Sequence, residues 1–318
     1  MKKKVVLVTG VGGDIGQSVL KCLNDLEFDF ELIGSDVDLY AAGKKNVDHF
    51  IQSPWAKNND KYLDFINRLI KNKGIGYVFP TTESEIKFFD KYRESFCRKN
   101  VAIFINNSNI INTFFDKYKT IGFLKRHNLP HPKTYLLEDF RNQLPYPVII
   151  KPRNSWGGKG LILVNDKANL SFLKKRLKDA VAQEIVGIPE EEYTACVFSC
   201  PKITFSIVFK RELGYGSLTK VAKLIFDDEV KQLAEKIANF SSLEGSLNIQ
   251  LRKTKDGYIP FEINPRLSST VYLRHYFGFK DVKWWICLKQ NKKIEFKLNY
   301  RNGVGVRTIS EAFFDLEK

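Results

Sequence analysis

The first 112 residues alternate short apolar runs with amphipathic segments. Residues 17–26 and 62–71 have the apolar spacing of helices, and residues 81–85 supply the capping side chains that begin another helix. Strands that alternate with helices predict a parallel sheet covered by helices, so we expect residues 1–112 to form a small α/β domain. The apolar runs that we interpret as its strands are residues 4–8, 30–35, 76–80 and 101–105.

Beyond residue 112 the pattern changes to alternating runs joined by turns. Residues 167–181 and 227–239 are predicted to be helices, and Asp256-Gly257 between two alternating runs predicts a β-hairpin. Antiparallel strands with helices on one face make this part α+β. Its predicted strands include residues 146–151, 161–164, 182–186, 202–211, 247–251 and 258–263.

A glycine turn at residues 9–16 joins the first strand to the first helix and gives the N-terminal domain a Rossmann-like character. Asp36 lies twenty residues past Gly16, where the ribose-binding acid of a dinucleotide fingerprint would be. In that interpretation the chain is an NAD(P)-dependent oxidoreductase. The chain lacks a well-placed Tyr-x-x-x-Lys pair for such a reductase. We therefore favour a turn kept for tight packing or for holding substrate.

Composition places the chain among folded proteins, because 43% of its residues are apolar and 27% are charged. No apolar run approaches the roughly 20 residues of a membrane span, and the run behind the basic N-terminus is too short for a signal peptide. We expect a cytoplasmic protein with no membrane association. The five scattered cysteines have neither zinc spacing nor a disulfide pattern.

Basic residues exceed acidic ones by 51 − 36 = 15. They are spread along the chain, and no nucleic-acid-binding motif occurs. We therefore expect small polyanionic ligands, and no nucleic acid.

The predicted hairpin carries oxygen ligands for a metal ion. Glu262 and Asn264 are two residues apart, so on a strand they point to the same face, and pairing across the hairpin brings Gln250 close to them. A carboxylate beside amide oxygens suits Mg²⁺. Arg266 follows with a guanidinium suited to phosphate oxygens. These residues predict a site for a nucleoside triphosphate with its metal.

A second phosphate-binding candidate is the loop at residues 152–160. Gly157, Gly158 and Gly160 would allow the backbone to close over a phosphate with its N–H groups, and Lys159 adds positive charge. The loop is not a Walker A loop, because no Gly-Lys pair is followed by Ser or Thr.

The order of six motifs resembles the ATP-grasp superfamily, especially its carbamoyl-phosphate-synthetase-like and pyrrolysine-biosynthesis-like ligases. The resemblance covers essentially the whole chain. It implies a pre-ATP-grasp domain at residues 1–112, a small lobe at 113–186, and a large lobe with the metal site at 187–318. The motifs are Asp116-Lys117, Val148-Ile149-Ile150-Lys151-Pro152 with the glycine loop, Gln183-Glu184-Ile185-Val186, Glu192-Tyr193-Thr194, Asn248-Ile249-Gln250, and Glu262-Ile263-Asn264-Pro265-Arg266.

The same resemblance implies the residue roles. Residues 184–186 would form a hinge that binds adenine, and Glu192 would bind the ribose. The link before Glu192 is longer than usual, so Glu191 is an alternative. Arg266, Lys159 and Arg211 would be catalytic, and Gln250, Glu262 and Asn264 would hold Mg²⁺, with Mn²⁺ as an alternative. The ATP-binding set would be Lys117, Lys151, Gly157, Gly158, Gly160, Glu184, Ile185, Val186 and Glu192.

An ATP-grasp ligase phosphorylates a carboxylate to an acyl phosphate, which an amine then attacks. The resemblance therefore implies small-molecule carboxylate and amine substrates, and it is compatible with a homodimer. Two alternatives stay open: the NAD(P)-dependent oxidoreductase, and a non-catalytic nucleotide-binding protein or basic nucleic-acid binder.

Overall fold

The computed structural model describes residues 3–155, 160–201, 203–214, 216, 218–296, 302–308 and 310–314. Internal contacts divide the chain into two compact units. Unit 1 comprises Met1–Asn107, Arg266–Arg301 and Thr308–Lys318, and unit 2 comprises Ser108–Pro265 and Asn302–Arg307. Residues 266–301 thus belong with the N-terminal unit, whereas the sequence placed them in a lobe at 187–318.

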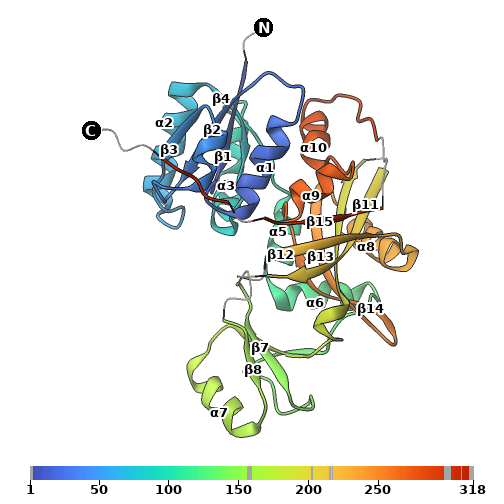
Figure 1. Ribbon diagram of the computed structural model, residues 1–318. Coiled ribbons are helices and arrows are strands. Elements are labelled where there is room, and N and C mark those ends of the chain that lie inside the picture. Colours follow the sequence, from blue (N-terminus) through green and yellow to red (C-terminus); the bar gives the residue numbers. More distant parts are fainter. Residues whose placement is uncertain are drawn as a thin grey trace. The chain divides into compact units, whose positions relative to one another are not determined.

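Unit 1 is built on a five-stranded parallel sheet in the order β3-β2-β1-β4-β5 (Figure 1). The parallel sheet expected here is confirmed, but β3 was not foreseen. The strands are β1 (Lys4–Thr9), β2 (Phe30–Asp36), β3 (His49–Gln52), β4 (Ile75–Phe79) and β5 (Ala102–Ile103).

The helices of unit 1 come from both ends of the chain. Thr82 and Glu85 form the capping box that begins α3, as the sequence predicted. Helices α9 and α10 pack on α1, and the rings of Phe104 and Trp285 form a T-shaped pair with their centroids 6.2 Å apart. The helical elements are α1 (Asp14–Asn24), η1 (Ala42–Asn46), α2 (Asn59–Lys73), α3 (Glu83–Lys91), α4 (Arg93–Cys97), α9 (Val271–Tyr276) and α10 (Asp281–Lys289).

The larger sheet of unit 2 is antiparallel, in the order β14-β13-β10-β11-β12-β15. One face carries alternate apolar side chains of β10 and β13, which pack with Val230, Leu233 and Ile237 of α8 into a buried core. The elements around this core are α5 (Ser108–Phe114), α6 (Lys117–Arg126), η2 (Pro189–Glu191), β10 (Glu192–Cys200), β11 (Ile203–Leu213), β12 (Thr219–Ile225), α8 (Asp228–Phe240), β13 (Gly245–Thr254), β14 (Gly257–Asn264) and β15 (Val304–Val306).

Unit 2 also contains a four-stranded antiparallel sheet in the order β6-β9-β7-β8, with α7 beside β7 and β8 (Figure 1). The helix predicted over residues 167–181 is wrong beyond Arg176. Asp179 has a left-handed backbone (φ 51°), and Ala180 already pairs with Pro152. The elements are β6 (Thr134–Leu136), β7 (Val148–Pro152), β8 (Ile162–Val164), α7 (Lys167–Arg176) and β9 (Ala180–Glu184).

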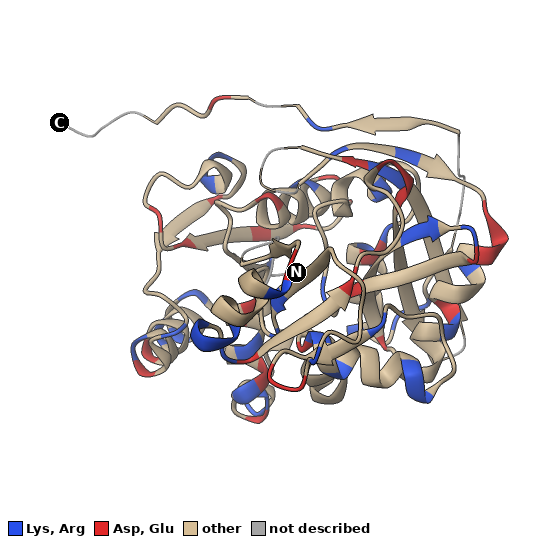
Figure 2. Ribbon diagram, turned by 90° about the horizontal axis from the view of Figure 1, so that it is seen from below, with Lys and Arg blue, Asp and Glu red and all other residues tan. Residues whose placement is uncertain are grey.

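Within the described part of the chain, no helix is both long and apolar enough to cross a membrane. Basic and acidic residues are interspersed over helices and strands in Figure 2. None of the five cysteines forms a disulfide, and Cys22, Cys196 and Cys287 are buried.

Candidate active site

The second face of the large sheet in unit 2 carries the polar residues that the motifs singled out. In β10 and β13 the apolar residues of one parity lie in the core with α8, so Glu192, Asn248 and Gln250 of the other parity lie on the opposite face. Asn248 pairs with Asn264 and Gln250 with Glu262 across the β13–β14 hairpin. The hairpin that the Asp-Gly turn predicted is therefore present, and its register brings the expected metal ligands together.

The three expected metal ligands differ in their contacts. The amide nitrogen of Asn264 donates to Glu262 Oε1 at 3.0 Å, which leaves the amide oxygen of Asn264 for other contacts. The amide oxygen of Gln250 accepts a hydrogen bond from Arg211 Nη2 at 2.8 Å. No group of three or more His, Cys, Asp or Glu side chains is placed for a metal among the described residues. A carboxylate with amide oxygens nonetheless suits a hard divalent cation, with Glu262 as its single anionic ligand.

Asn248 lies on the same sheet face, opposite Asn264, and was not among the predicted site residues. Its amide oxygen accepts from the Thr194 hydroxyl at 2.8 Å, and the Cys196 thiol lies 3.3 Å from the same oxygen. These buried contacts fix the side chain of Asn248. A spacing of two residues from Gln250 is the sequence signal that could have identified it.

Lys151 of β7 is buried and donates to Gln183 Oε1 at 2.6 Å. Burial lowers the pKa of Lys151 to about 8, and the nearby carboxylate of Glu262 partly opposes that shift. Its ammonium also lies 5.7 Å from the ring centre of Phe261 on β14. The structure thus brings Lys151 close to Glu262, although the two are far apart in sequence.

Lys117 is the first residue of α6, whose N-cap is Asp116. The Lys117 ammonium donates to the backbone oxygen and the hydroxyl of Ser155, and Asp116 pairs with Arg153 at 2.5 Å. Lys117 therefore contacts the first part of the predicted phosphate-binding loop. Gly157, Gly158 and Lys159 of that loop lie outside the described residues.

Gly160 follows the loop with a left-handed backbone, φ 74°. A Cβ at this position would lie 2.8 Å from Cγ of Pro152. Both the conformation and the close approach require glycine here.

The predicted hinge, residues 184–186, begins at Glu184, the last residue of β9. The Glu184 carboxylate accepts from the backbone N–H of Lys133 at 2.6 Å, while Ile185 is exposed and Val186 is buried. Arg252 Nη1 donates to the carbonyl oxygen of Val186 at 3.2 Å. Arg252 had no predicted role.

Glu192 is buried and is held by two arginines. Arg211 donates to Oε1 through Nε at 3.0 Å and Nη2 at 2.6 Å, and Arg252 donates to Oε2 through Nε at 3.1 Å and Nη2 at 2.9 Å. Glu191 instead binds Lys210 and the hydroxyl of Tyr193, which belong to the core face. The geometry favours Glu192 over Glu191 as the residue that faces the site.

Arg266 begins the second segment of unit 1. Its Nη1 donates to the backbone oxygen of Leu267 at 3.0 Å, and its buried Nε has no hydrogen-bond partner among the described residues. Within the described part of unit 1, no carboxylate forms an ion pair with it. The side chain keeps donors for an anionic ligand.

The glycine turn of unit 1 is explained by packing. A Cβ on Gly16 would collide with the carbonyl oxygen of Gly10 and lie 2.8 Å from Cα of Val11. Asp36 accepts from the backbone N–H of Gly12 at 2.7 Å and of Asp38 at 3.0 Å, so both its oxygens are bonded to the backbone. These contacts favour a structural turn over a dinucleotide site.

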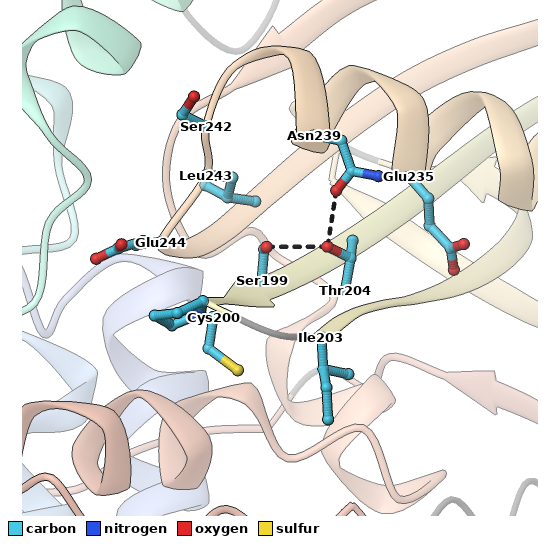
Figure 3. A pocket seen from close by; sticks show the side chains of 10 residues that line it. Ser199, Cys200, Ile203, Thr204, Glu235, Asn239, Ser242, Leu243 and Glu244 are labelled. Atoms are coloured by element: carbon cyan, nitrogen blue, oxygen red, sulfur yellow. Dashed lines mark hydrogen bonds between the residues drawn. The ribbon is translucent and has the colours of Figure 1, made fainter.

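A cavity of about 570 Å³ lies at the other end of β10 and contains none of the predicted site residues (Figure 3). Its polar wall includes a chain of hydrogen bonds from Ser199 through Thr204 to Asn239. Glu235 and Glu244 also line it.

Comparison with known proteins identifies the region that carries these residues. A family model described as the ATP-grasp domain matches residues 114–270. The coenzyme γ-F420-2:α-L-glutamate ligase of Methanocaldococcus jannaschii is 28% identical over 204 residues, which cover 56% of this chain and 65% of the relative. The α-aminoadipate–LysW ligase LysX of Saccharolobus solfataricus is 29% identical over 194 residues, which cover 54% of this chain and 70% of the relative.

An uncharacterized protein of Mycoplasma genitalium, MG011, is 26% identical over 181 residues. The chain spans 63% and 65% of the first two curated relatives, which is less than two thirds of their own length.

Solved structures resemble the chain over nearly its whole length. A biotin carboxylase complex with β-γ-ATP from Campylobacter jejuni has a TM-score of 0.74 at 15% identity and covers 95% of this chain and 74% of its own. An L-amino acid ligase from Bacillus licheniformis has a TM-score of 0.71 at 15% identity, and the match covers 91% of this chain and 75% of the ligase. At this identity the likeness shows a shared fold.

Proposed function

Because a family model of the ATP-grasp domain matches residues 114–270, we propose that the chain is an ATP- and Mg²⁺-dependent ligase. It would activate a carboxylate as an acyl phosphate, which an amine then attacks to form a C–N bond. The observation that carries the proposal is the polar sheet face on which Glu262 and Asn264 touch, with the buried Lys151 beside Glu262. The names of the relatives, which include ligases that act with glutamate and α-aminoadipate, support the same reaction class.

The chemistry needs little covalent participation by the protein. A carboxylate oxygen of the acid attacks the γ-phosphorus of ATP, the bond to the β–γ bridging oxygen breaks, and ADP leaves. The amine then attacks the acyl carbon, the bond from that carbon to the phosphate oxygen breaks, and the nitrogen loses a proton. Such phosphoryl transfer depends on positioning and on neutralising charge.

Residues of this chain would supply that neutralisation. Lys117 and Lys151 would bind phosphate oxygens, and Arg266, two residues after Asn264 in the chain, would bind the transferred phosphoryl group. Glu262 and Asn264 would hold Mg²⁺, with Gln250 as a third ligand if its amide oxygen exchanges Arg211 for the metal. Mg²⁺ bound with ATP would neutralise charge that develops on the phosphates.

Titration calorimetry with Mg·ATP tests the proposal. We expect the wild type to bind Mg·ATP in a Mg²⁺-dependent manner and the double variant Glu262→Ala/Asn264→Ala to lose that binding. Asp256→Ala, at the exposed tip of the same hairpin, is the matched control and should bind like the wild type. A folded wild type that does not bind Mg·ATP would contradict the proposal. If Mg·ATP binds, acids and amines can be screened for ADP release, which separates a ligase from a non-catalytic nucleotide-binding protein.

A further inference from the structure

Arg252 joins parts of the candidate site that no motif connects. It lies on β13, two residues after Gln250, and its side chain is 21% exposed. Its guanidinium donates to the Val186 carbonyl and to Glu192, and it lies 5.4 Å from the ring centre of Phe261. One side chain therefore contacts the hinge and the carboxylate predicted to bind ribose.

The hinge has little freedom to shift against Arg252. Gly187, directly after it, has a left-handed backbone with φ 52°. A Cβ on Gly187 would lie 3.0 Å from the carbonyl oxygen of Lys253 and 3.1 Å from Cβ of Arg252. The chain after Val186 thus lies directly on β13. With the Val186 carbonyl bound by Arg252, the peptide group that joins Val186 to Gly187 is held in one orientation.

Glu192 is fixed by the same guanidinium. Arg252 binds Oε2 and Arg211 binds Oε1, so both oxygens accept charge-assisted hydrogen bonds. In the register of the sheet, Glu192 lies opposite Arg252. Loss of Arg252 would leave Oε2 of a buried carboxylate without this cation, and only Arg211 would then hold the side chain.

We propose that Arg252 is a positioning residue for nucleotide selection, which holds the hinge and Glu192 in the geometry that accepts adenosine. The proposal rests on the proposed ATP site. Adenine N1 is a hydrogen-bond acceptor, whereas guanine N1 carries a proton. A backbone N–H in the hinge that is held in one orientation can donate to N1 of adenine but not to N1 of guanine. A Glu192 carboxylate held in one position can likewise accept a hydrogen bond from the 2′-hydroxyl of the ribose.

The test is calorimetric titration of the full chain with Mg·ATP, Mg·GTP and Mg·2′-deoxyATP. We expect Arg252→Met to weaken Mg·ATP binding about tenfold or more, and to reduce the preference for ATP over both GTP and 2′-deoxyATP. Arg252→Lys keeps the charge but not the fork of donors, so it should lose the same preferences. Thermal unfolding of each variant verifies its fold. If Arg252→Met does not fold, Arg252→Lys alone tests the nucleotide preferences.

The adjacent ion pair provides a matched control. Lys210→Met removes the cationic partner of Glu191 in an ion pair on the core face of the sheet. We expect this variant to keep the nucleotide preferences of the wild type.

The outcomes separate the two proposals. If the wild type binds ATP and folded Arg252 variants keep all its preferences, this inference is overturned while the ATP site stands. If the folded wild type binds no nucleotide, the ATP site is overturned and this inference with it.

Discussion

Glu192 illustrates how single side chains of the candidate site depend on partners far away in the sequence. Its two arginines, Arg211 and Arg252, are 19 and 60 positions distant. Motif order predicted Glu192 and Arg211 as separate functional residues, but it could not predict that they bind each other. Sequence spacing identifies residues on one strand face, and only the register between strands brings distant residues together.

Lys151 provides a prediction at the scale of the residue. Its pKa, lowered from 10.5 to about 8 by burial, lies below the ordinary value, so the ammonium loses its proton as the pH rises through about 8. If the ammonium binds phosphate, Mg·ATP affinity should be nearly constant below pH 7.5 and fall up to about tenfold per pH unit above pH 8. Calorimetry from pH 6.5 to 9.5 measures this dependence.

Lys151→Arg is the control, because its guanidinium stays charged over this range. It should abolish the decline at high pH. An affinity for the wild type that stays constant up to pH 9.5 would contradict the role of Lys151. The free energy of unfolding should change in the opposite direction and increase between about pH 8 and 10.5. In this range Lys151 is protonated in the unfolded chain but not in the folded one.

At the scale of elements, the sequence predicted most of the strands and helices and the β13–β14 hairpin that carries the proposed metal ligands. The misses have physical reasons. Strand β3 is only four residues long, without a buried residue, and depends on parallel pairing with β2 rather than on its own pattern. Helix α7 ends at Arg176, before the end of the helix predicted over residues 167–181, because Leu177, Lys178 and Asp179 form the turn that leads into β9.

Two helical glycines give a prediction at this scale. Gly16→Ala in α1 should destabilise the protein by about 1–3 kcal/mol, because its Cβ would collide with the backbone of Gly10 and Val11. A Cβ on Gly122 in α6 would have no atom within 4 Å, so Gly122→Ala should stabilise the protein by about 0.5–1 kcal/mol. Urea unfolding of both variants measures the difference. If the two substitutions change the free energy of unfolding equally, the glycine turn is not constrained by packing.

At the scale of the whole molecule, the division into units was the part that the sequence foresaw least. Residues 266–301 follow the β13–β14 hairpin directly in the chain, so the order of motifs predicts that they belong to the same lobe. In the structure, α9 and α10 pack with α1, the Cys22 thiol lies 3.8 Å from the Val271 carbonyl, and Trp285 is buried. Unit 1 is therefore built from segments far apart in sequence, which an ordered reading of motifs cannot predict.

This organisation predicts how fragments behave. Residues 1–107 expressed alone should not unfold cooperatively, because α1 would lose its packing against α9 and α10, and Phe104 would lose Trp285. Joining residues 266–301 to this fragment through a flexible linker should restore a cooperative transition. Circular dichroism during heating compares the two. A sharp transition in residues 1–107 alone would show that the later segment is dispensable for unit 1.

Burial of Lys151 has a consequence for chemical reactivity. With a pKa of about 8, roughly a tenth of this side chain is neutral amine at pH 7, whereas an unperturbed lysine is neutral in about one molecule of a few thousand. The neutral amine is the nucleophilic form. Among the many lysines of this chain, Lys151 is therefore predisposed to capture an electrophile delivered into the site, such as an acylating analogue of the nucleotide.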